Sequence, residues 1–585
     1  MSKEGSTTTP TAITGIQAMQ GHGVQQSRGF WAEAWSQVIR RFSAIFGLTW
    51  LGIVAFFAVF APIIASGHPI RFVKTDENGV RSVSMPLLNF LTPADWLLLI
   101  ATFGGGIFLL LPIPRLTRAK RVGWIIVAIV AGTIPVLLIT LLRSSAAGDW
   151  LFGLLNAIRE LERDQQGNAR TAYAVGAISL GASIGLLATL WLPFAERIST
   201  RLVWLVLAVS CSGIVLGKTW DNKPPLFQYG EAIRSGTAEA TFTLIPWSPG
   251  QRPVDRNTST MAPGETEDQA LIRNIDNALS NYLDSEDLPL NAPIGSHGFD
   301  IVRDVIARQP LSDEAKARIT TKLDEYQASN PDAIRRDIGV IDAGKSTGVL
   351  AEEFGRTGQT YPLGTDDQGR DMLSQLLHAC RLSISIGLVS TGISLVIGVT
   401  IGALMGYFGG WVDLVLYRVV EIFMAIPVLF LLILAAGVLP KNIYVMMIII
   451  GCFSWTGAAR FIRAEFLKLR NMDFVQSARA TGLPLRSILF KHMLPNGVTP
   501  VLVESSFAIA AAILAEATLS FLGLGPDNQA SWGKLLSSAT GESSEFFWWL
   551  AIFPGAAIFL TVLSYNLIGE ALRDAIDPKL KKARV

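Results

Sequence analysis

Apolar runs of about 20 residues, the length a helix needs to cross the hydrocarbon core of a membrane, alternate with polar connections along most of the chain. They predict ten transmembrane helices, at residues 44–66, 96–114, 122–142, 171–194, 202–217, 381–407, 411–438, 443–462, 498–522 and 548–572. A long polar segment separates the fifth run from the sixth. The pattern therefore predicts an all-α polytopic membrane protein of about ten transmembrane helices with one large polar insertion.

Positive charges indicate how the helices are oriented. With a cytoplasmic N-terminus, the inner connections after the second, fourth and eighth spans and the C-terminal tail carry Lys or Arg, in agreement with the positive-inside rule. These residues include Arg115, Arg118, Lys120, Arg121, Arg197, Arg201, Arg460, Arg463, Lys468, Arg470, Lys579, Lys581, Lys582 and Arg584. Both termini are then expected in the cytoplasm, and the polar segment outside it.

The polar segment is long enough for a small domain. Residues 267–283 and 312–328 have the periodicity of amphipathic helices, and Ser312 is placed to cap the second. Ile272, Ile275, Leu279 and Tyr282 would form one apolar face of the first helix. Whether the segment folds independently does not follow from this pattern.

Composition supports a membrane protein and removes other classes. Half of the 585 residues are hydrophobic and only 16% are charged. Neither the cysteines nor the histidines have the spacing of metal ligands, and no nucleophile or paired-carboxylate motif is present. Basic residues lack the interleaved aromatic residues of a nucleic-acid platform. We therefore expect no enzyme activity, no metal, no cofactor on this chain and no nucleic-acid partner.

Residues 473–495 form a basic loop between two predicted spans and read DFVQSARATGLPLRSILFKHMLP. Asp473 followed by Gln476 has the form of a capping box, which would start a helix, and Gly482 with Pro484 would end it after about two turns. The loop is therefore expected to contain a short helix with defined ends, at residues 474–481.

The spacing of this loop resembles the EAA signature of importer-type ABC permeases. The matching positions are Gln476, Ser477, Ala478, Gly482 and Pro495, although Gln476 stands where the family usually has Glu and Ser477 where it usually has Ala. Residues 361–371, 516–525 and 566–578 also resemble segments of the C-type permease subunit of the dipeptide, oligopeptide and nickel importers. Residues 31–65 resemble the first span of that family more loosely.

The resemblance implies partners and a mechanism. The loop helix would dock on an ATPase, with Asp473, Arg479, Arg486 and Lys491 as further contact residues. The complex would contain a B-type permease in a heterodimer, two ABC ATPase subunits that hold ATP with Mg, and an extracytoplasmic solute-binding protein. It would lie in the lipid of the bacterial cytoplasmic (inner) membrane and import peptides, or else nickel or related small solutes.

The resemblance also suggests a domain organisation. Residues 1–43 would be a cytoplasmic tail with an amphipathic helix, 44–66 the first transmembrane helix, and 67–217 an inserted region with four further spans. Residues 218–377 would be extracytoplasmic, 378–575 the permease core with five spans, and 576–585 a basic cytoplasmic tail.

One motif competes with this interpretation. Residues 339–346, with Gly339, Lys345 and Ser346, match the phosphate-loop pattern of nucleotide-binding proteins. That pattern requires a strand before it and a helix after it, and the flanking residues favour neither. We interpret the segment as a flexible glycine-rich connector.

Polar residues at membrane depth are candidates for a substrate path. Arg418 and Glu421 lie three apart and can pair on a helix, with Asp413 close by. Glu504, Glu516 and Asn566 could line a path or hydrogen-bond one helix to another. These alternatives stay open at the level of sequence.

Three glycines, Gly398, Gly402 and Gly406, recur every fourth residue, so they share one helix face that another backbone can approach closely. The face could pack within the chain or form the seam with a partner permease.

Two other classes of protein compete with the permease interpretation. A self-sufficient secondary transporter or channel would use the embedded charges, and a membrane-anchored sensor or enzyme would use the polar segment. The inverted hydropathy repeats of a secondary transporter are not evident.

Overall fold

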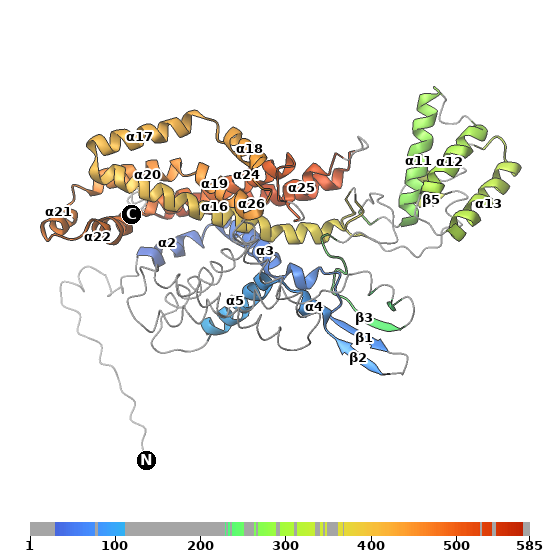
Figure 1. Cartoon of the computed structure of the whole chain (residues 1–585), viewed down its shortest axis with the longest axis horizontal. Helices are drawn as coiled ribbons and strands as arrows, with labels where there is room; N and C mark the ends of the chain where they lie inside the picture. The colour runs from blue at the N-terminus through green and yellow to red at the C-terminus, as the bar shows by residue number, and fades with distance from the viewer. Residues whose placement is uncertain are drawn as a thin grey trace, which may run out of the picture.

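The computed structural model describes residues 30–75, 80–110, 229, 232–233, 237–250, 263–264, 267–287, 293–308, 313–333, 340–342, 345–347, 361–366, 368–526, 529–540 and 546–576. The chain forms a long helix bundle with two smaller units beside one end, a three-stranded sheet and a group of three helices (Figure 1). A bent loop with short helices occupies the opposite end of the bundle. We refer to these as the sheet end and the loop end.

Seven of the ten predicted spans overlap described helices, and six of these correspond to helices or helix pairs that are long and apolar enough to cross a membrane. Four helices are long and apolar enough to cross a membrane: α3 (Phe42–Ile64), α16 (Met372–Phe408), α24 (Thr499–Phe521) and α26 (Trp548–Ile576). Two bent helix pairs raise the number to as many as six within the described residues. The predicted spans at 122–142, 171–194 and 202–217 lie outside the described residues. Helix α5 (Pro93–Leu110) overlaps the predicted span 96–114 but is not among those six.

The prediction of one continuous helix over 411–438 is wrong. The chain instead forms α17 (Gly410–Ala425) and α18 (Val428–Val438), bent by 79°. Pro427 begins the second helix as its N-cap, and a proline disfavours helical conformation in the residue before it. Over 443–462 the chain forms α19 (Ile443–Phe453) and α20 (Thr456–Leu469), bent by 41°.

Helix α16 is the central helix of the bundle. It contacts α3, α19, α20 and α24 along its length, while α26 packs on α3 and α24. Trp532 of α25 (Trp532–Ser537) is buried between them and donates from Nε1 to the carbonyl of Leu376 at 3.2 Å. Short helix α2 (Phe30–Val38) packs on the last turns of α26, where Arg41 and Asp574 form an ion pair at 2.5 Å.

The entry to α16 is held by a buried loop. Asp371 is the N-cap, and its Oδ2 accepts a hydrogen bond from the backbone N–H of Ser374 at 2.7 Å. Asp366, fully buried, accepts from Arg370 Nε at 2.7 Å and from Gln375 Nε2 at 2.9 Å. The carboxylate of Asp366 therefore fixes both the turn that precedes α16 and its first helical turn.

Outside the bundle lies an antiparallel sheet in the order β2-β1-β3. Its strands are β1 (Arg71–Thr75), β2 (Arg81–Ser84) and β3 (Ala238–Thr241), and the register pairs Val73 with Val83 and with Glu239. Helix α4 (Pro86–Phe90) follows β2. Strands from the start of the predicted inserted region are thus hydrogen-bonded to a strand of the predicted extracytoplasmic segment, an arrangement that the predicted all-helical pattern did not include.

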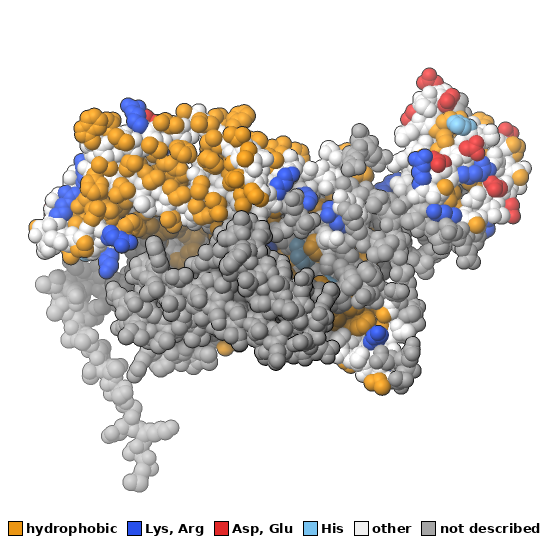
Figure 2. Space-filling view, viewed as in Figure 1, with side chains coloured by type: hydrophobic (Ala, Val, Ile, Leu, Met, Phe, Trp, Pro, Cys, Tyr) orange, Lys and Arg blue, Asp and Glu red, His pale blue; other side chains and the backbone are white. Residues whose placement is uncertain are grey.

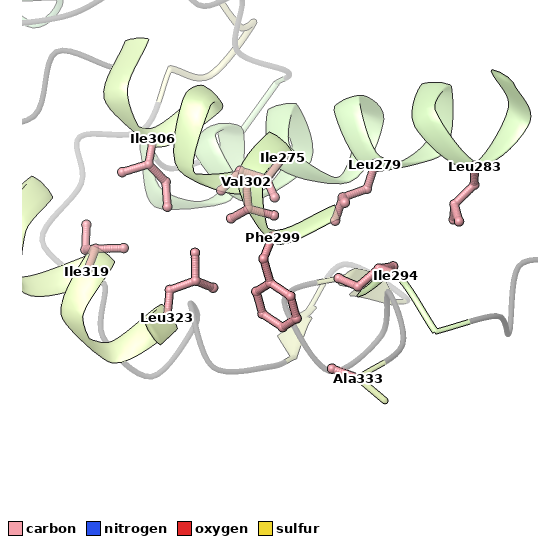
Figure 3. Packing of buried hydrophobic residues seen from close by; sticks show 10 residues of the cluster. All are labelled: Ile275, Leu279, Leu283, Ile294, Phe299, Val302, Ile306, Ile319, Leu323 and Ala333. Atoms are coloured by element: carbon pink, nitrogen blue, oxygen red, sulfur yellow. The ribbon is translucent and has the colours of Figure 1, made fainter. Parts of the chain in front are cut away.

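A second unit consists of α11 (Glu267–Ser285), α12 (Gly295–Arg308) and α13 (Asp313–Ser329). Its side chains meet in one dry core, drawn in Figure 3, of Ile275, Leu279, Leu283, Ile294, Phe299, Val302, Ile306, Ile319, Leu323 and Ala333. The two predicted amphipathic helices are confirmed as α11 and α13. Helix α12 was not predicted, and it supplies the centre of the core.

Candidate functional site

The loop end is built around helix α21 (Asp473–Ala480). Met472 is its N-cap residue and makes no side-chain capping bond, and Asp473 is the first helical residue. Gln476 donates from Nε2 to the carbonyl of Arg470 at 3.1 Å, so it does not reach back to Asp473. The predicted capping box is therefore wrong. The acidic Asp473 still lies in the first turn, where the helix dipole favours a negative charge.

The predicted stop at Gly482 is confirmed. Gly482 has a φ of +69°, a left-handed conformation that glycine adopts without steric strain. Its N–H donates to the carbonyl of Arg479 at 3.0 Å, and that of Leu483 donates to Ala478 at 3.2 Å. These two bonds form a Schellman motif, which satisfies carbonyls that the last turn would leave without partners. Pro484 then begins the three-residue helix α22 (Leu485–Ser487).

Helix α21 is seated on the bundle through one face. Val475 and Ala478 are buried and share a cluster with Ile488, Leu489 and Met493 of the π-helix η1 (Ile488–Met493). The cluster also contains Phe466 of α20 and Val501 of α24. Displacement of α21 would therefore displace the helices beneath it, because close-packed side chains transmit such movement.

Several other positions of the loop expose apolar side chains. These are Met472, Phe474, Leu483, Leu485 and Phe490, each between 37% and 42% exposed. We call these five residues the apolar rim. They project from a connection between spans, where the neighbouring exposed residues are polar or charged, including Asp473, Gln476, Ser477, Arg486 and Lys491. The sequence interpretation considered the charged residues of this loop and missed the rim, although all five rim residues are apolar side chains within a largely polar loop.

The basic residues of the loop differ in their surroundings. The guanidinium of Arg479 lies over the ring of Tyr407 at 4.5 Å, a cation–π contact with the last turn of α16. Arg486 and Lys491 are exposed, and so is Pro495 in α23 (Leu494–Gly497). Arg479 thus helps to fix α21 on α16, whereas Arg486 and Lys491 present charge to the surroundings.

Two ion pairs stabilise the bent helix α17. Arg418 and Glu421 pair at 2.5 Å, as their spacing predicted, and both side chains are exposed at the surface of the described bundle. Asp413 pairs with Arg463 of α20 instead, through oxygens at 2.5 and 2.7 Å from Nε and Nη2. Such a bidentate contact fixes orientation as well as distance, so it joins α17 to α20 near the loop end.

The remaining polar candidates are dispersed. Glu516 is fully buried and accepts a hydrogen bond from Ser520 at 2.6 Å, which is a contact within α24. Glu504 lies twelve residues earlier on the same helix, about 18 Å away at 1.5 Å per residue. Glu504 and Asn566, the latter on α26, are half-buried. The structure therefore does not gather Glu504 and Glu516 into one site.

The glycine row packs within the chain. A Cβ at Gly402 would lie 2.5 Å from the carbonyl oxygen of Ala459, and one at Gly406 would lie 2.4 Å from the Cβ of Phe466. Gly398 approaches Trp455 and Ala458 in the same way. All of these partners belong to α20 or to its N-cap. The face is consequently occupied by α20 and is not a seam with a second permease.

The phosphate-loop motif adopts a different structure. Strands β4 (Val340–Asp342) and β5 (Lys345–Thr347) pair antiparallel, with Asp342 opposite Lys345. Lys345 thus lies in a strand of a tight hairpin, where a nucleotide site would require the start of a helix. The flexible connector we expected is also wrong over these residues, because they form paired strands.

Comparison with known proteins places this sequence in a family. Residues 398–582 match the model of the binding-protein-dependent transport system inner membrane component. Residues 29–79 match the N-terminal TM domain of oligopeptide transport permease C. The chain is 41% identical over 217 residues to the oligopeptide transport system permease protein OppC of Haemophilus influenzae, which covers 37% of this chain and 70% of that protein. The chain belongs to the family of binding-protein-dependent transport permeases.

Other relatives of this permease agree. The dipeptide transport system permease protein DppC of Alkalihalophilus pseudofirmus is 36% identical over 37% of this chain and 72% of the relative. The glutathione transport system permease protein GsiD of Pectobacterium atrosepticum is 38% identical over 37% of this chain and 73% of the relative. A structure of the MetNI methionine ABC transporter aligns with 35% of this chain and 96% of its own at 17% identity, with a TM-score of 0.29. The assignment therefore rests on the sequence matches.

Proposed function

We propose that this permease is the C-type subunit of an ATP-driven importer of short peptides and that residues 473–495 couple it to a separate ATPase. The relatives named for oligopeptide, dipeptide and glutathione transport share a cargo that contains peptide bonds, which favours peptides over nickel. The partner set is a B-type permease, two ATPase subunits and an extracytoplasmic binding protein. ATP with Mg would be bound by the ATPase subunits.

The apolar rim is the observation that carries the coupling role. An interaction surface typically has apolar anchors surrounded by polar groups, and the rim has this composition with Arg486 and Lys491 beside it. Full burial of an exposed aromatic side chain contributes about 1.5–3 kcal/mol, so burial of the exposed part of Phe474 or Phe490, 39% and 42%, would contribute about 1 kcal/mol each. The seated face, Val475 and Ala478, would pass the movement of a docked ATPase into α16, α20 and α24.

The orientation follows from the same proposal. A docking loop for an ATPase lies in the cytoplasm, and the sheet and the three-helix unit then lie outside it. Seven Lys and Arg residues in or beside the loop support this orientation through the positive-inside rule. They are Arg460, Arg463, Lys468, Arg470, Arg479, Arg486 and Lys491.

A pair of charge substitutions tests the proposal. Phe474→Asp with Leu485→Asp should place carboxylates in the contact, abolish co-purification of the ATPase subunits and reduce uptake of a labelled tripeptide by about 100-fold. Membrane insertion should be unchanged, because both side chains are exposed. Val83→Asp, at an exposed apolar position of β2, is the matched control and should leave both readouts intact. A doubly substituted permease that still binds its ATPase would disprove the coupling role.

A further inference from the structure

A cavity of about 350 Å³ lies at the sheet end, where α3, α4, α5 and α16 meet. Its polar lining comes from segments far apart in sequence: Ser66 and His68 after α3, Thr92 and Asp95 at α5, Ser248 after β3, and His378 and Arg381 on α16. The volume is within the range of small-molecule sites. Arg381 and Tyr407 are 26 residues apart on α16, about 40 Å at 1.5 Å per residue, so the cavity is remote from the loop.

The acidic group in the cavity already has partners. Asp95 Oδ2 accepts from the backbone N–H and from the hydroxyl of Thr92, both at 2.6 Å. Its Oδ1 accepts from Nη1 of Arg381. Both oxygens of this buried carboxylate are thus engaged, and Asp95 holds Arg381 in one orientation.

The guanidinium group of Arg381 has a second edge that Asp95 does not contact. Its Nε and Nη2 are buried and have no acceptor within the part of the chain that the structure describes. These two nitrogens lie on the same edge of the planar guanidinium, with parallel N–H bonds. That edge matches the two oxygens of a carboxylate or a phosphate, which guanidinium groups bind in a bidentate manner. Buried donors normally have acceptors, so the unused edge is a candidate for a ligand. Because each of the two nitrogens exposes less than 1 Å² to solvent, an anion reaches this edge only when the side chains that cover it move apart.

His378 lies one turn before Arg381 and also lines the cavity. Its Nδ1 is 2.9 Å from the carbonyl oxygen of Ser374, and because a carbonyl only accepts, Nδ1 carries the proton. The ring is thereby held in place beside the guanidinium. Among the described residues that line the cavity, Asp95 is the one carboxylate, and its charge is already paired.

We propose that this cavity binds an oxyanion, a carboxylate or phosphate group, on the Nε–Nη2 edge of Arg381. Two sources carry that chemistry at the outer end of a membrane bundle. One is the phosphate of a phospholipid headgroup, and the other is the C-terminal carboxylate of a peptide. Only the peptide source rests on the proposed function.

Calorimetric titration of the full-length chain in neutral detergent tests the proposal and separates the sources. The lipid probe is dioctanoyl phosphatidylglycerol, compared with dioctanoylglycerol, which lacks the phosphate. The peptide probe is trialanine, compared with its C-terminal amide. At least one anionic probe should bind about tenfold or more tightly than its neutral counterpart. Equal binding within both pairs would overturn the proposal.

Two variants assign the binding to the cavity. Arg381→Lys should raise the Kd of the preferred probe by about tenfold, because an ammonium group cannot present two parallel donors. Asp95→Asn should change that Kd, because it removes both the negative charge nearest the anion and the partner that orients Arg381. If Arg381→Lys does not fold, Asp95→Asn still decides, and an unchanged Kd there refutes the site. Neither assay involves ATP or the loop, so failure here leaves the coupling role untouched.

Discussion

The loop end and the three-helix unit place their apolar side chains in opposite ways. The α11–α13 unit directs its large apolar residues into one shared core, as Figure 3 shows, and its surface carries many charges of both signs (Figure 2). The loop buries only one face of α21 and leaves the apolar rim exposed. The first is composed like a small soluble domain, and the second like half of an interface.

The difference indicates which region depends on a partner. The three-helix unit buries ten apolar residues against one another, eight of them on its helices. Exposed Phe, Leu and Met side chains such as those of the apolar rim are typical of a surface that another protein or a membrane covers. Substitutions at the loop end should therefore affect coupling, and substitutions in the three-helix core should affect local folding.

The largest effect is expected at Gly482. Gly482→Asp forces a residue with a Cβ into a φ of +69° and disrupts the turn that orients the rim, so uptake should fall by about 100-fold or more. Gly523 is a matched control, because it ends α24 at a φ of +76° with the same pattern of backbone bonds. Gly523→Asp should incur the same strain but retain the ATPase, as measured by co-purification. Equal loss of the ATPase in both variants would remove the special role of the loop.

The next largest effect is expected in the three-helix core. Phe299→Ala removes a side chain that is 1% exposed and should destabilise the unit by about 3–5 kcal/mol. Limited proteolysis of the full chain should then cut within residues 267–333, while ATPase binding persists. Val305→Ala, at a half-buried position of the same helix, should have a clearly smaller effect. Loss of ATPase binding in Phe299→Ala would contradict the independence of the two regions.

A pH-dependent effect is expected at the N-cap of α16. Burial raises the pKa of Asp371 from 3.8 to about 6, because desolvation disfavours its charged form. The folded state therefore binds the proton more tightly than the unfolded state, so this group stabilises the fold below pH 4 and that stabilisation is lost as the pH rises through 6. The shift corresponds to about 3 kcal/mol.

Asp371→Asn should remove this dependence. Asparagine can still accept the capping bond from Ser374 without a charge, so the variant should match the wild type at pH 4 and be more stable at pH 7. Thermal unfolding of the detergent-solubilised chain between pH 4 and 7 measures both. An unchanged slope in the variant would show that another group is responsible.

The smallest effect is expected on the surface of the three-helix unit. Arg303 pairs with Asp300 and Asp324, each at 2.7 Å, and all three side chains are substantially exposed. Exposed ion pairs contribute little, so Arg303→Gln should change the stability of the unit by about 0.5 kcal/mol. The protease sensitivity of Arg303→Gln is compared with that of Phe299→Ala, in which the core is disrupted. A comparable loss in Arg303→Gln would mean that charge, and not the core, holds these helices together.

Much of the bundle could be predicted because long apolar runs are a strong signal. The spans of α3, α16, α24 and α26 and the helices α11 and α13 follow directly from composition and periodicity. Helix α12 was missed because His297 and Gly298 interrupt its first turn, although Phe299, Val302 and Ile306 share one face. The bend at Pro427 had a sequence signal that the length of the apolar run obscured.

The site was predicted less completely, because its features depend on distant segments. Gly482 acts locally, so its role could be read from the sequence. The contact of Arg479 with Tyr407 and the bond from Gln476 to Arg470 depend on how α21 lies against the preceding helices. Asp95 and Arg381 are 286 residues apart, and no local pattern joins them.

The pairing of β1 with β3 has a consequence for how this chain can change length. Residues 71–75 and 238–241 are neighbours in one sheet, so the chain leaves and re-enters the fold at the same place. Helix α5 lies between these strands, packs on α3 and pairs with α16 through Asp95 and Arg381, so it belongs to the packed fold. A change in chain length between α5 and β3 would leave the pairing of β1 with β3 in place, and the transport core would keep its geometry.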